Sequence, residues 1–143
     1  MSIWKIPVTA ELLNKNTGDT MVTYLGIEFT EIGDDFIAGK MPVDDRTRQP
    51  FGILHGGAHV VLAETLGSTA ANLVLEPGSS HAVGLDINSN HIKSVRDGYV
   101  YGVAKPIHLG NSTQVWEIKI SDEQGSLLNI SRLTMYVVQK KGK

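Results

Sequence analysis

The stretch that decides the fold covers residues 56–75 and reads GGAHVVLAETLGSTAANLVL. Its apolar residues fall on nearly every face of the helix that it would form, and a helix that is apolar all round is a buried one. About 20 residues at a rise of ~1.5 Å give a helix of roughly 30 Å, the width of a small domain. Glu76-Pro77-Gly78 follows, where Pro cannot continue the helix and Gly permits a turn. We therefore expect one long, buried helix.

Strands are predicted on both sides of this helix. Alternation of apolar and polar residues, with turn residues between the runs, is typical of strands. After the helix, Val83, Leu85 and Ile87 alternate with small or polar residues, which predicts a strand with one apolar face. The predicted elements are a short helix at 9–16, strands at 24–32 and 36–43, and four strands that begin near residues 83, 99, 115 and 127.

The order of these elements indicates the fold class. A helix that is buried on both sides needs a sheet that curls around it. We therefore expect an α+β fold in which one long central helix is wrapped by a curved antiparallel sheet. The chain length suits one domain with one sizeable core, so residues 1–143 are interpreted as a single domain.

Composition and charge exclude several classes of function. The formal net charge of -2 gives no general attraction to nucleic acid, and no run approaches the roughly 18 apolar residues needed to cross a bilayer. The chain has no cysteine, so disulfides, Cys-ligated zinc and thiol nucleophiles are excluded. A secretory signal is not recognisable, which predicts a cytoplasmic protein without nucleic-acid or membrane partners.

The histidine spacing gives little support for a metal site. His55 and His59 are four residues apart, the spacing of two zinc ligands on a helix. The zincin pattern needs Glu directly after the first His, whereas Gly56 follows here. We therefore expect no bound metal, and we expect His59 to be exposed or to lie at an interface.

Glu64 is the anomaly of the long helix. It lies among apolar residues, where a carboxylate is costly unless it is paired or reaches water. Ser68 is four residues further on, so its hydroxyl shares the same helical face. Glu64 is thus a candidate catalytic carboxylate. A bland alternative places it on a narrow solvent-facing stripe with Ser68 and Asn72, and the pattern alone does not decide between the two.

The residues before the helix favour the catalytic interpretation. Gln49 and His55 bring side-chain donors to this segment, and Gly56-Gly57 brings bare backbone. The first amides of a helix have no partner within it and carry partial positive charge. Consecutive glycines let a substrate oxygen approach such amides closely. The Gly56 amide would be well placed to bind the oxyanion that forms when a thioester carbonyl is attacked.

The segment QPFGILHGGA at 49–58, together with VVLAE at 60–64 and GS at 67–68, resembles the hot-dog thioesterases of the 4-hydroxybenzoyl-CoA type. The subgroup that it resembles uses a helix Glu and includes thioesterases of 1,4-dihydroxy-2-naphthoyl-CoA. The likeness continues at 84–91, 105–110 and 114–118. Together with the segments at 49–68, it spans nearly the whole chain. The resemblance implies a hot-dog fold and hydrolysis of an acyl-CoA, with a slight preference for an aromatic acyl group. It implies no cofactor other than the coenzyme A of the substrate, and a homo-oligomer, either a dimer or a tetramer.

The resemblance also implies roles for individual residues. Glu64 would be the nucleophile or general base, and the Gly56 amide would polarise the thioester oxygen. Gln49 and His55 would position thioester and water, and Ser68 would orient the carboxylate or water. Residues near the coenzyme A would be His91, Lys93, Ser112 and Thr113. Two departures from the family pattern stand out: Lys93 replaces an expected Arg, which removes a bidentate phosphate contact, and His59 replaces a small residue.

Two other functions remain open at this point. The enzyme could act on acyl groups of an acyl carrier protein, for which a basic docking patch is needed, and the candidates for it are Arg46, Arg48, Lys93 and Arg96. The chain could instead be a non-catalytic module that binds acyl-CoA. Such a module has no need for Glu64 with Ser68 and Gln49, so their presence argues against it.

Overall fold

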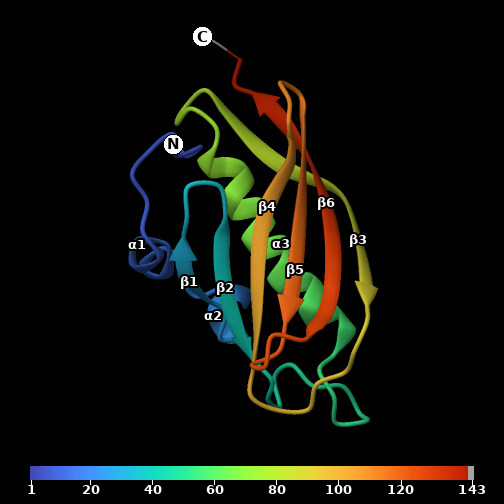
Figure 1. Ribbon diagram of the computed structural model, residues 1–143. Coiled ribbons are helices and arrows are strands. Elements are labelled where there is room, and N and C mark those ends of the chain that lie inside the picture. Colours follow the sequence, from blue (N-terminus) through green and yellow to red (C-terminus); the bar gives the residue numbers. More distant parts are fainter. Residues whose placement is uncertain (142–143) are drawn as a thin grey trace.

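A six-stranded antiparallel sheet curves around one long helix, α3 (Gly56–Leu73), in the computed structural model, which describes residues 1–141 (Figure 1). The strand order is β1-β2-β4-β5-β6-β3, and every neighbouring pair is antiparallel. The other elements are α1 (Ala10–Lys15), α2 (Met21–Tyr24), β1 (Glu28–Ile32), β2 (Ile37–Pro42), β3 (Ser80–His91), β4 (Tyr99–Leu109), β5 (Thr113–Ser121) and β6 (Leu127–Gln139). This confirms the predicted α+β arrangement of a central helix wrapped by a curved sheet.

One face of α3 packs against the sheet. Its buried residues recur every three or four positions, as one helix face requires; they are Ala58, His59, Leu62, Ala63, Leu66, Gly67, Ala70 and Ala71. The other side, which carries Glu64 and Ser68, is half-buried. The expectation of burial all round was therefore wrong, because the sheet curves around only part of the helix. Among residues 1–141 no helix is both long enough and apolar enough to cross a membrane.

Glycines let the helix and the sheet approach closely around Leu66. A Cβ on Gly39 or on Gly102 would lie 2.7 Å from the Leu66 side chain, so both positions need to stay without a side chain. Leu66 itself is fully buried. Truncation of such a side chain typically costs about 2–5 kcal/mol, so this contact strongly stabilises the position of α3.

β5 shows the alternation that the sequence predicts. Trp116, Ile118 and Ile120 are fully buried, whereas the residues between them are half-buried or exposed. Trp116 donates from Nε1 to Gln114 Oε1 at 2.8 Å and stacks on Trp4 with ring centroids 6.4 Å apart. β5 therefore lies at the centre of the core.

The first predicted strand is shorter than expected. The prediction covered 24–32, but β1 begins only at Glu28, because the short helix α2 ends at Tyr24 and is followed by a turn. Gly26 in this turn has a φ of 73°, a conformation that favours glycine. The chain therefore makes a turn between α2 and β1.

The predicted apolar face of β3 is not buried within the chain. Val83 and Leu85 are 42% and 60% exposed. A β-bulge explains this: Gly84 pairs with Met135, but Asp86 rather than Leu85 takes the next pairing position, so the alternation shifts by one residue. The face of β3 on the same side as the buried face of β6 consists of Ala82, Gly84, Ile87, Ser89 and His91. Mostly small and polar residues therefore lie beside α3 at this edge of the sheet.

Candidate active site

The start of α3 has one backbone donor that is left free. His55, the N-cap residue, accepts at Nδ1 from the Gly57 N–H at 2.8 Å. The His55 carbonyl accepts from the N–H groups of Ala58 and His59 at 2.9 Å and 3.4 Å. Among the described residues, the Gly56 N–H has no hydrogen-bond partner. Because such amides carry partial positive charge, this N–H is available to an oxygen from outside the chain.

A cavity of about 280 Å³ opens beside this amide. The loop before α3 supplies one part of its wall, and the end of β3 with the residues after it supplies another. The lining residues are Gln49, Ile53, Leu54, Gly56, His59, His91, Ile92, Lys93 and Ser94. The predicted site residues that meet here are Gln49, Gly56, His91 and Lys93.

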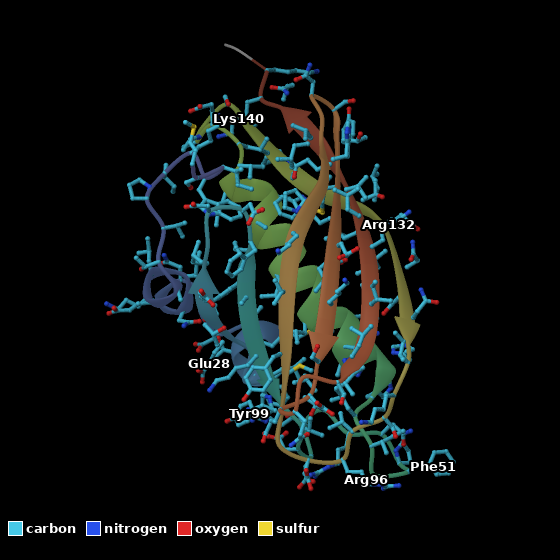
Figure 2. All side chains as sticks on the ribbon, in the orientation of Figure 1. Glu28, Phe51, Arg96, Tyr99, Arg132 and Lys140 are labelled. Atoms are coloured by element: carbon cyan, nitrogen blue, oxygen red, sulfur yellow. The ribbon has the colours of Figure 1, made fainter. Side chains whose placement is uncertain are left out.

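Gln49 is held by its own loop. Its Oε1 accepts from the Phe51 N–H, its N–H donates to the Ile53 carbonyl at 2.9 Å, and its carbonyl accepts from the Gly52 N–H at 2.9 Å. Figure 2 shows Phe51 and Arg96 at this end of the molecule, where Arg96 donates to the Phe51 carbonyl at 3.3 Å. With Oε1 turned to the Phe51 N–H, the Nε2 amide group of Gln49 stays available as a donor at the cavity that Gln49 lines.

His55 is exposed and does not line the cavity. Since its Nδ1 accepts the hydrogen bond from Gly57, the neutral ring carries its proton on Nε2. The side chain therefore caps the helix, and its role in positioning thioester and water stays a prediction.

His59 is buried, contrary to the expectation of an exposed or interface residue. Only 4% of it is exposed, and its Nδ1 has no hydrogen-bond partner within residues 1–141. It falls on the buried stripe of α3, because it precedes Leu62 by three positions and Leu66 by seven. Burial, together with the nearby His91 ring, lowers the pKa of His59 to about 4, so the ring is neutral at pH 7. No group of three or more His, Asp or Glu side chains among residues 1–141 is arranged to hold a metal ion.

His91, the last residue of β3, and Lys93 line the same cavity as the Gln49 loop. A Cβ on Gly56 would be 2.9 Å from His91 Nε2, so glycine leaves room for this ring. Lys93 forms an ion pair with Asp122 at 3.7 Å. The hydrogen bond from the Ser126 N–H is the main cause that lowers the pKa of Asp122, and Lys93 contributes to the same shift. The Lys93 side chain is 57% exposed and that of Asp122 only 11%, so the ammonium group lies at the cavity but already has a carboxylate partner.

Glu64 lies further along α3, on its half-buried side. It faces β3 where that strand has no side chain: a Cβ on Gly84 would lie 3.6 Å from Glu64 Oε1. Among residues 1–141, Glu64 has no ion pair within 4.0 Å and no side-chain hydrogen bond. The β-bulge at Leu85 follows directly, and bulges are common next to active sites. Within residues 1–141 the carboxylate is therefore unpaired, half-buried, and close to the Gly84 backbone of β3.

The neighbours of Glu64 on the helix differ in what they do. Asn72 accepts from the Ala82 N–H at 2.9 Å and donates to the Ala82 carbonyl at 3.2 Å, which joins α3 to β3. Ser68 is half-buried, and its side chain makes no hydrogen bond with Glu64. The proposed stripe of Glu64, Ser68 and Asn72 therefore exists, but Asn72 serves the fold, and the predicted contact between Ser68 and the carboxylate is not formed in this structure.

The predicted site residues do not all meet within one chain. Gly56 and Glu64 are eight positions apart on α3, which is ~12 Å along its axis. One thioester carbonyl spans only a small part of that distance. Ser112 and Thr113 lie at the β4–β5 turn. On β6, Thr113 pairs with Tyr136 and His91 pairs with Asn129, and these two β6 positions are ~23 Å apart along the strand. Figure 1 places this turn and the start of α3 at opposite ends of the molecule.

Comparison with known proteins assigns the chain to a family. The thioesterase superfamily matches residues 51–129, more than half of the chain, including the start of α3. The chain belongs to this superfamily. A 1,4-dihydroxy-2-naphthoyl-CoA hydrolase of Escherichia coli is 54% identical to this thioesterase over 95% of the chain and 99% of its own length. A proofreading thioesterase EntH of Cronobacter turicensis is 50% identical over 95% of the chain and 98% of its own length.

Solved structures agree with this assignment. A thioesterase of Haemophilus influenzae superposes with a TM-score of 0.93 at 50% identity and covers 96% of this chain and 95% of that one. A mutant thioesterase of Pseudomonas aeruginosa superposes with a TM-score of 0.95 at 45% identity and covers 97% of this chain and 100% of that one. The predicted hot-dog fold and the predicted thioester hydrolase are therefore confirmed.

Several residues of this site were missed in the sequence. His59 lines the cavity, Gly84 faces the carboxylate, and Asn129 contacts His91 with its Nδ2 3.0 Å from His91 Nδ1. The sequence did hold a clue to Asn129. In the alternating pattern of β6 it falls on the same face as the buried apolar residues Leu133 and Met135, where a polar residue is unusual.

Proposed function

We propose that this thioesterase hydrolyses an acyl-CoA to a free acid and coenzyme A, and that it prefers an aromatic acyl group. One observation carries the proposal: the unpaired Gly56 N–H lies at a cavity that Gln49, His91 and Lys93 also line. The likeness to the 1,4-dihydroxy-2-naphthoyl-CoA hydrolase supports the aromatic acyl group. The reaction needs no cofactor, since coenzyme A is part of the substrate.

In the proposed mechanism, hydrogen-bond donors of the protein bind the carbonyl oxygen of the thioester, and a carboxylate acts at its carbonyl carbon. The thioester oxygen accepts hydrogen bonds from the Gly56 N–H and from the side-chain amide of Gln49. These bonds stabilise the negative charge that develops on the oxygen. Glu64 either attacks the carbon, forms an acyl anhydride and expels the CoA thiolate, or takes a proton from an attacking water. Water cleaves the anhydride in the first route, so both routes give one acid and one thiol. In the roles that the resemblance implies, His55 would position thioester and water, and Ser68 would orient the carboxylate or water.

The ~12 Å between Gly56 and Glu64 along α3 supports a site that is shared by two copies of the chain. The Glu64 of one copy would face the helix start of the other. The edge strand β3 supplies a surface for such pairing, because Val83 and Leu85 are exposed there and an unpaired edge tends to find a partner. Ser112 and Thr113 would reach the coenzyme A phosphates only from another copy, with Lys93 as the cation. The active form is therefore a homodimer or a homotetramer.

A thiol-release screen tests the proposal most broadly. Benzoyl-, naphthoyl-, medium-chain and long-chain acyl-CoA are offered at equal concentration, and the appearance of free coenzyme A is measured. We expect the highest kcat/KM for the two aromatic substrates. Faster turnover of a long-chain substrate would overturn the assigned acyl class, and binding without thiol release from any substrate would overturn acyl-CoA hydrolysis. Light scattering on the same sample tests the oligomer, since a fully active monomer contradicts a shared site.

A carrier-protein substrate is the second candidate. Arg48 donates from Nε to the Arg96 carbonyl at 2.9 Å, so two of the proposed basic residues meet at the end of the molecule where the cavity lies. The likeness to a proofreading thioesterase supports this candidate as well. The patch is weak, because Arg46 pairs with Asp44 and Lys93 with a carboxylate. Rates on matched CoA and carrier-protein thioesters separate the two, and a higher kcat/KM on the carrier protein would replace acyl-CoA as the main substrate.

A further inference from the structure

A group of polar side chains is buried between β3 and β6, beside the start of α3. Asn129 is fully buried and Ser131 is 2% exposed, both on the inner face of β6, where their neighbours Leu133 and Met135 belong to the apolar core. Ser89 joins them from β3. Burial of polar groups in a core costs stability unless each finds a hydrogen bond. A buried group whose members are hydrogen-bonded to one another is rigid, so it can hold a neighbouring side chain in one orientation.

The hydrogen bonds of this group lead to His91. Asn129 Nδ2 donates to Ser89 Oγ at 2.8 Å and lies 3.0 Å from His91 Nδ1. The Ser131 hydroxyl is within reach of Asn129 Oδ1 at 2.9 Å and of Ser89 Oγ at 2.8 Å. Because Asn129 Oδ1 faces Ser131, the Nδ2 amide group is the one that faces His91. His91 Nδ1 is therefore the acceptor of this bond, and the neutral ring carries its proton on Nε2.

His91 Nε2 is in turn directed at the helix start. A Cβ added to Gly56 would lie 2.9 Å from this nitrogen, and both residues line the cavity. The ring packs against buried His59 with centroids 5.8 Å apart. The ring thus has a hydrogen bond on one nitrogen, a packing partner in His59, and its remaining N–H beside the free Gly56 amide.

We propose that Asn129 is a positioning residue of the thioesterase site: it fixes His91 in the Nε2–H form, so that His91 donates to the thioester oxygen together with the Gly56 N–H. This rests on the proposed function of the cavity. His91 thereby gains a role at the reacting carbonyl, in addition to the contact with coenzyme A that the resemblance implies. Ser89 and Ser131 hold the Asn129 amide in the orientation that this role requires.

Asn129→Asp tests the proposal with almost no change of shape. An Asp carboxylate can only accept, so in the neutral His91 ring it draws the proton to Nδ1 and leaves Nε2 without one. Activity is therefore compared at a pH where NMR shows the ring to be neutral in both proteins, because an imidazolium would keep its Nε2–H. We expect kcat to fall on the order of 10²-fold, as for loss of an oxyanion donor, with KM nearly unchanged. Imidazole nitrogen NMR is expected to show the His91 proton on Nε2 in the wild type and on Nδ1 in the variant. Asn129→Leu removes the donor without introducing a charge and is expected to lower kcat as well.

A double-mutant cycle separates positioning from a merely structural role. In a His91→Phe background, Asn129→Asp is expected to cost no further activity, because the group that it positions is gone. Ile37→Val, a change of a fully buried residue of β2 whose sheet partners are Ile32 and Ala104, controls for lost stability. Unchanged kcat in both folded Asn129 variants, a loss confined to KM, or equal losses with and without His91 would each overturn the proposal. A wild-type enzyme that releases no thiol from any acyl-CoA would instead overturn the proposed function.

Discussion

The start of α3 and its middle differ in how their polar groups are held. At the start, one chain gathers donors around a cavity and fixes them: Gln49 by its loop, His91 by Asn129. In the middle, Glu64 faces Gly84 and has no hydrogen-bond or ion-pair partner in the described part of the chain. The start of α3 has hydrogen-bond donors in fixed positions but no carboxylate that could react. The middle of α3 has such a carboxylate, Glu64, but no donors of this kind beside it. One chain thus holds two separate groups of polar residues, and under the proposed function these are the two halves of a catalytic site.

The largest expected effect is on the half that contains the carboxylate. Glu64→Gln keeps the shape of the side chain but removes its charge and its basicity. We expect thiol release to fall on the order of 10²–10⁴-fold, while the midpoint of thermal unfolding stays the same, because Glu64 makes no hydrogen bond that holds the fold. Glu76→Gln, in the exposed turn after the helix, is the matched control. Near-full activity of Glu64→Gln would remove this residue from the mechanism.

A pair of glycine substitutions compares the two halves directly. In Gly56→Ala the new Cβ meets the His91 ring at 2.9 Å and displaces it, so we expect a loss on the order of 10²-fold in kcat/KM. In Gly84→Ala the new Cβ lies 3.6 Å from Glu64, an ordinary contact, so we expect a loss below about tenfold. Steady-state kinetics on one substrate measure both. Equal losses would contradict the view that only the helix start is tightly preorganised.

His59 is expected to make stability depend on pH. Its pKa is lowered to about 4 in the folded protein from 6.5, so between these values the unfolded chain binds more protons than the folded one. Stability therefore falls as the pH drops from about 7 to about 4, by at most ~3 kcal/mol. Denaturant unfolding across this range measures the slope, and His59→Phe is expected to reduce it. An unchanged slope in His59→Phe would show that other groups cause the dependence.

The smallest expected effect concerns Asn72, which shares the stripe of Glu64. Asn72→Ala removes the two hydrogen bonds to Ala82 that join α3 to β3. We expect a loss of about 1–2 kcal/mol in the free energy of unfolding and only a modest change in kcat. If kcat fell as strongly as in Glu64→Gln, Asn72 would belong to the catalytic half rather than to the fold.

The sequence predicted the parts of the molecule that depend on local pattern. The long helix, the alternation of β5, and the grouping of Gln49 with Gly56 all follow from residue order and spacing. The faces of β3 could not be predicted, because the bulge at Leu85 arises from its pairing with β6. The burial of His59 was missed as well, since only the packed sheet decides which face of α3 is covered.

Which of the other predicted site residues come together depends on their distances in the folded chain. Ser112 and Thr113 were grouped with Lys93 by resemblance, and a linear sequence does not reveal that β5 and β6 separate them within one chain. Asn129 carried a recognisable signal, a polar residue in an apolar phase, but its contact with His91 depends on the β3–β6 register.

Mixed oligomers test the shared site most directly. Glu64→Gln and Gln49→Ala each disable a different half, and the two inactive variants are unfolded together, refolded as mixed dimers and assayed for thiol release. If the halves come from two copies, each mixed dimer has one intact site, and activity returns to roughly a quarter of the wild-type value. If both halves acted within one chain, the mixture would be no more active than the average of its two parents.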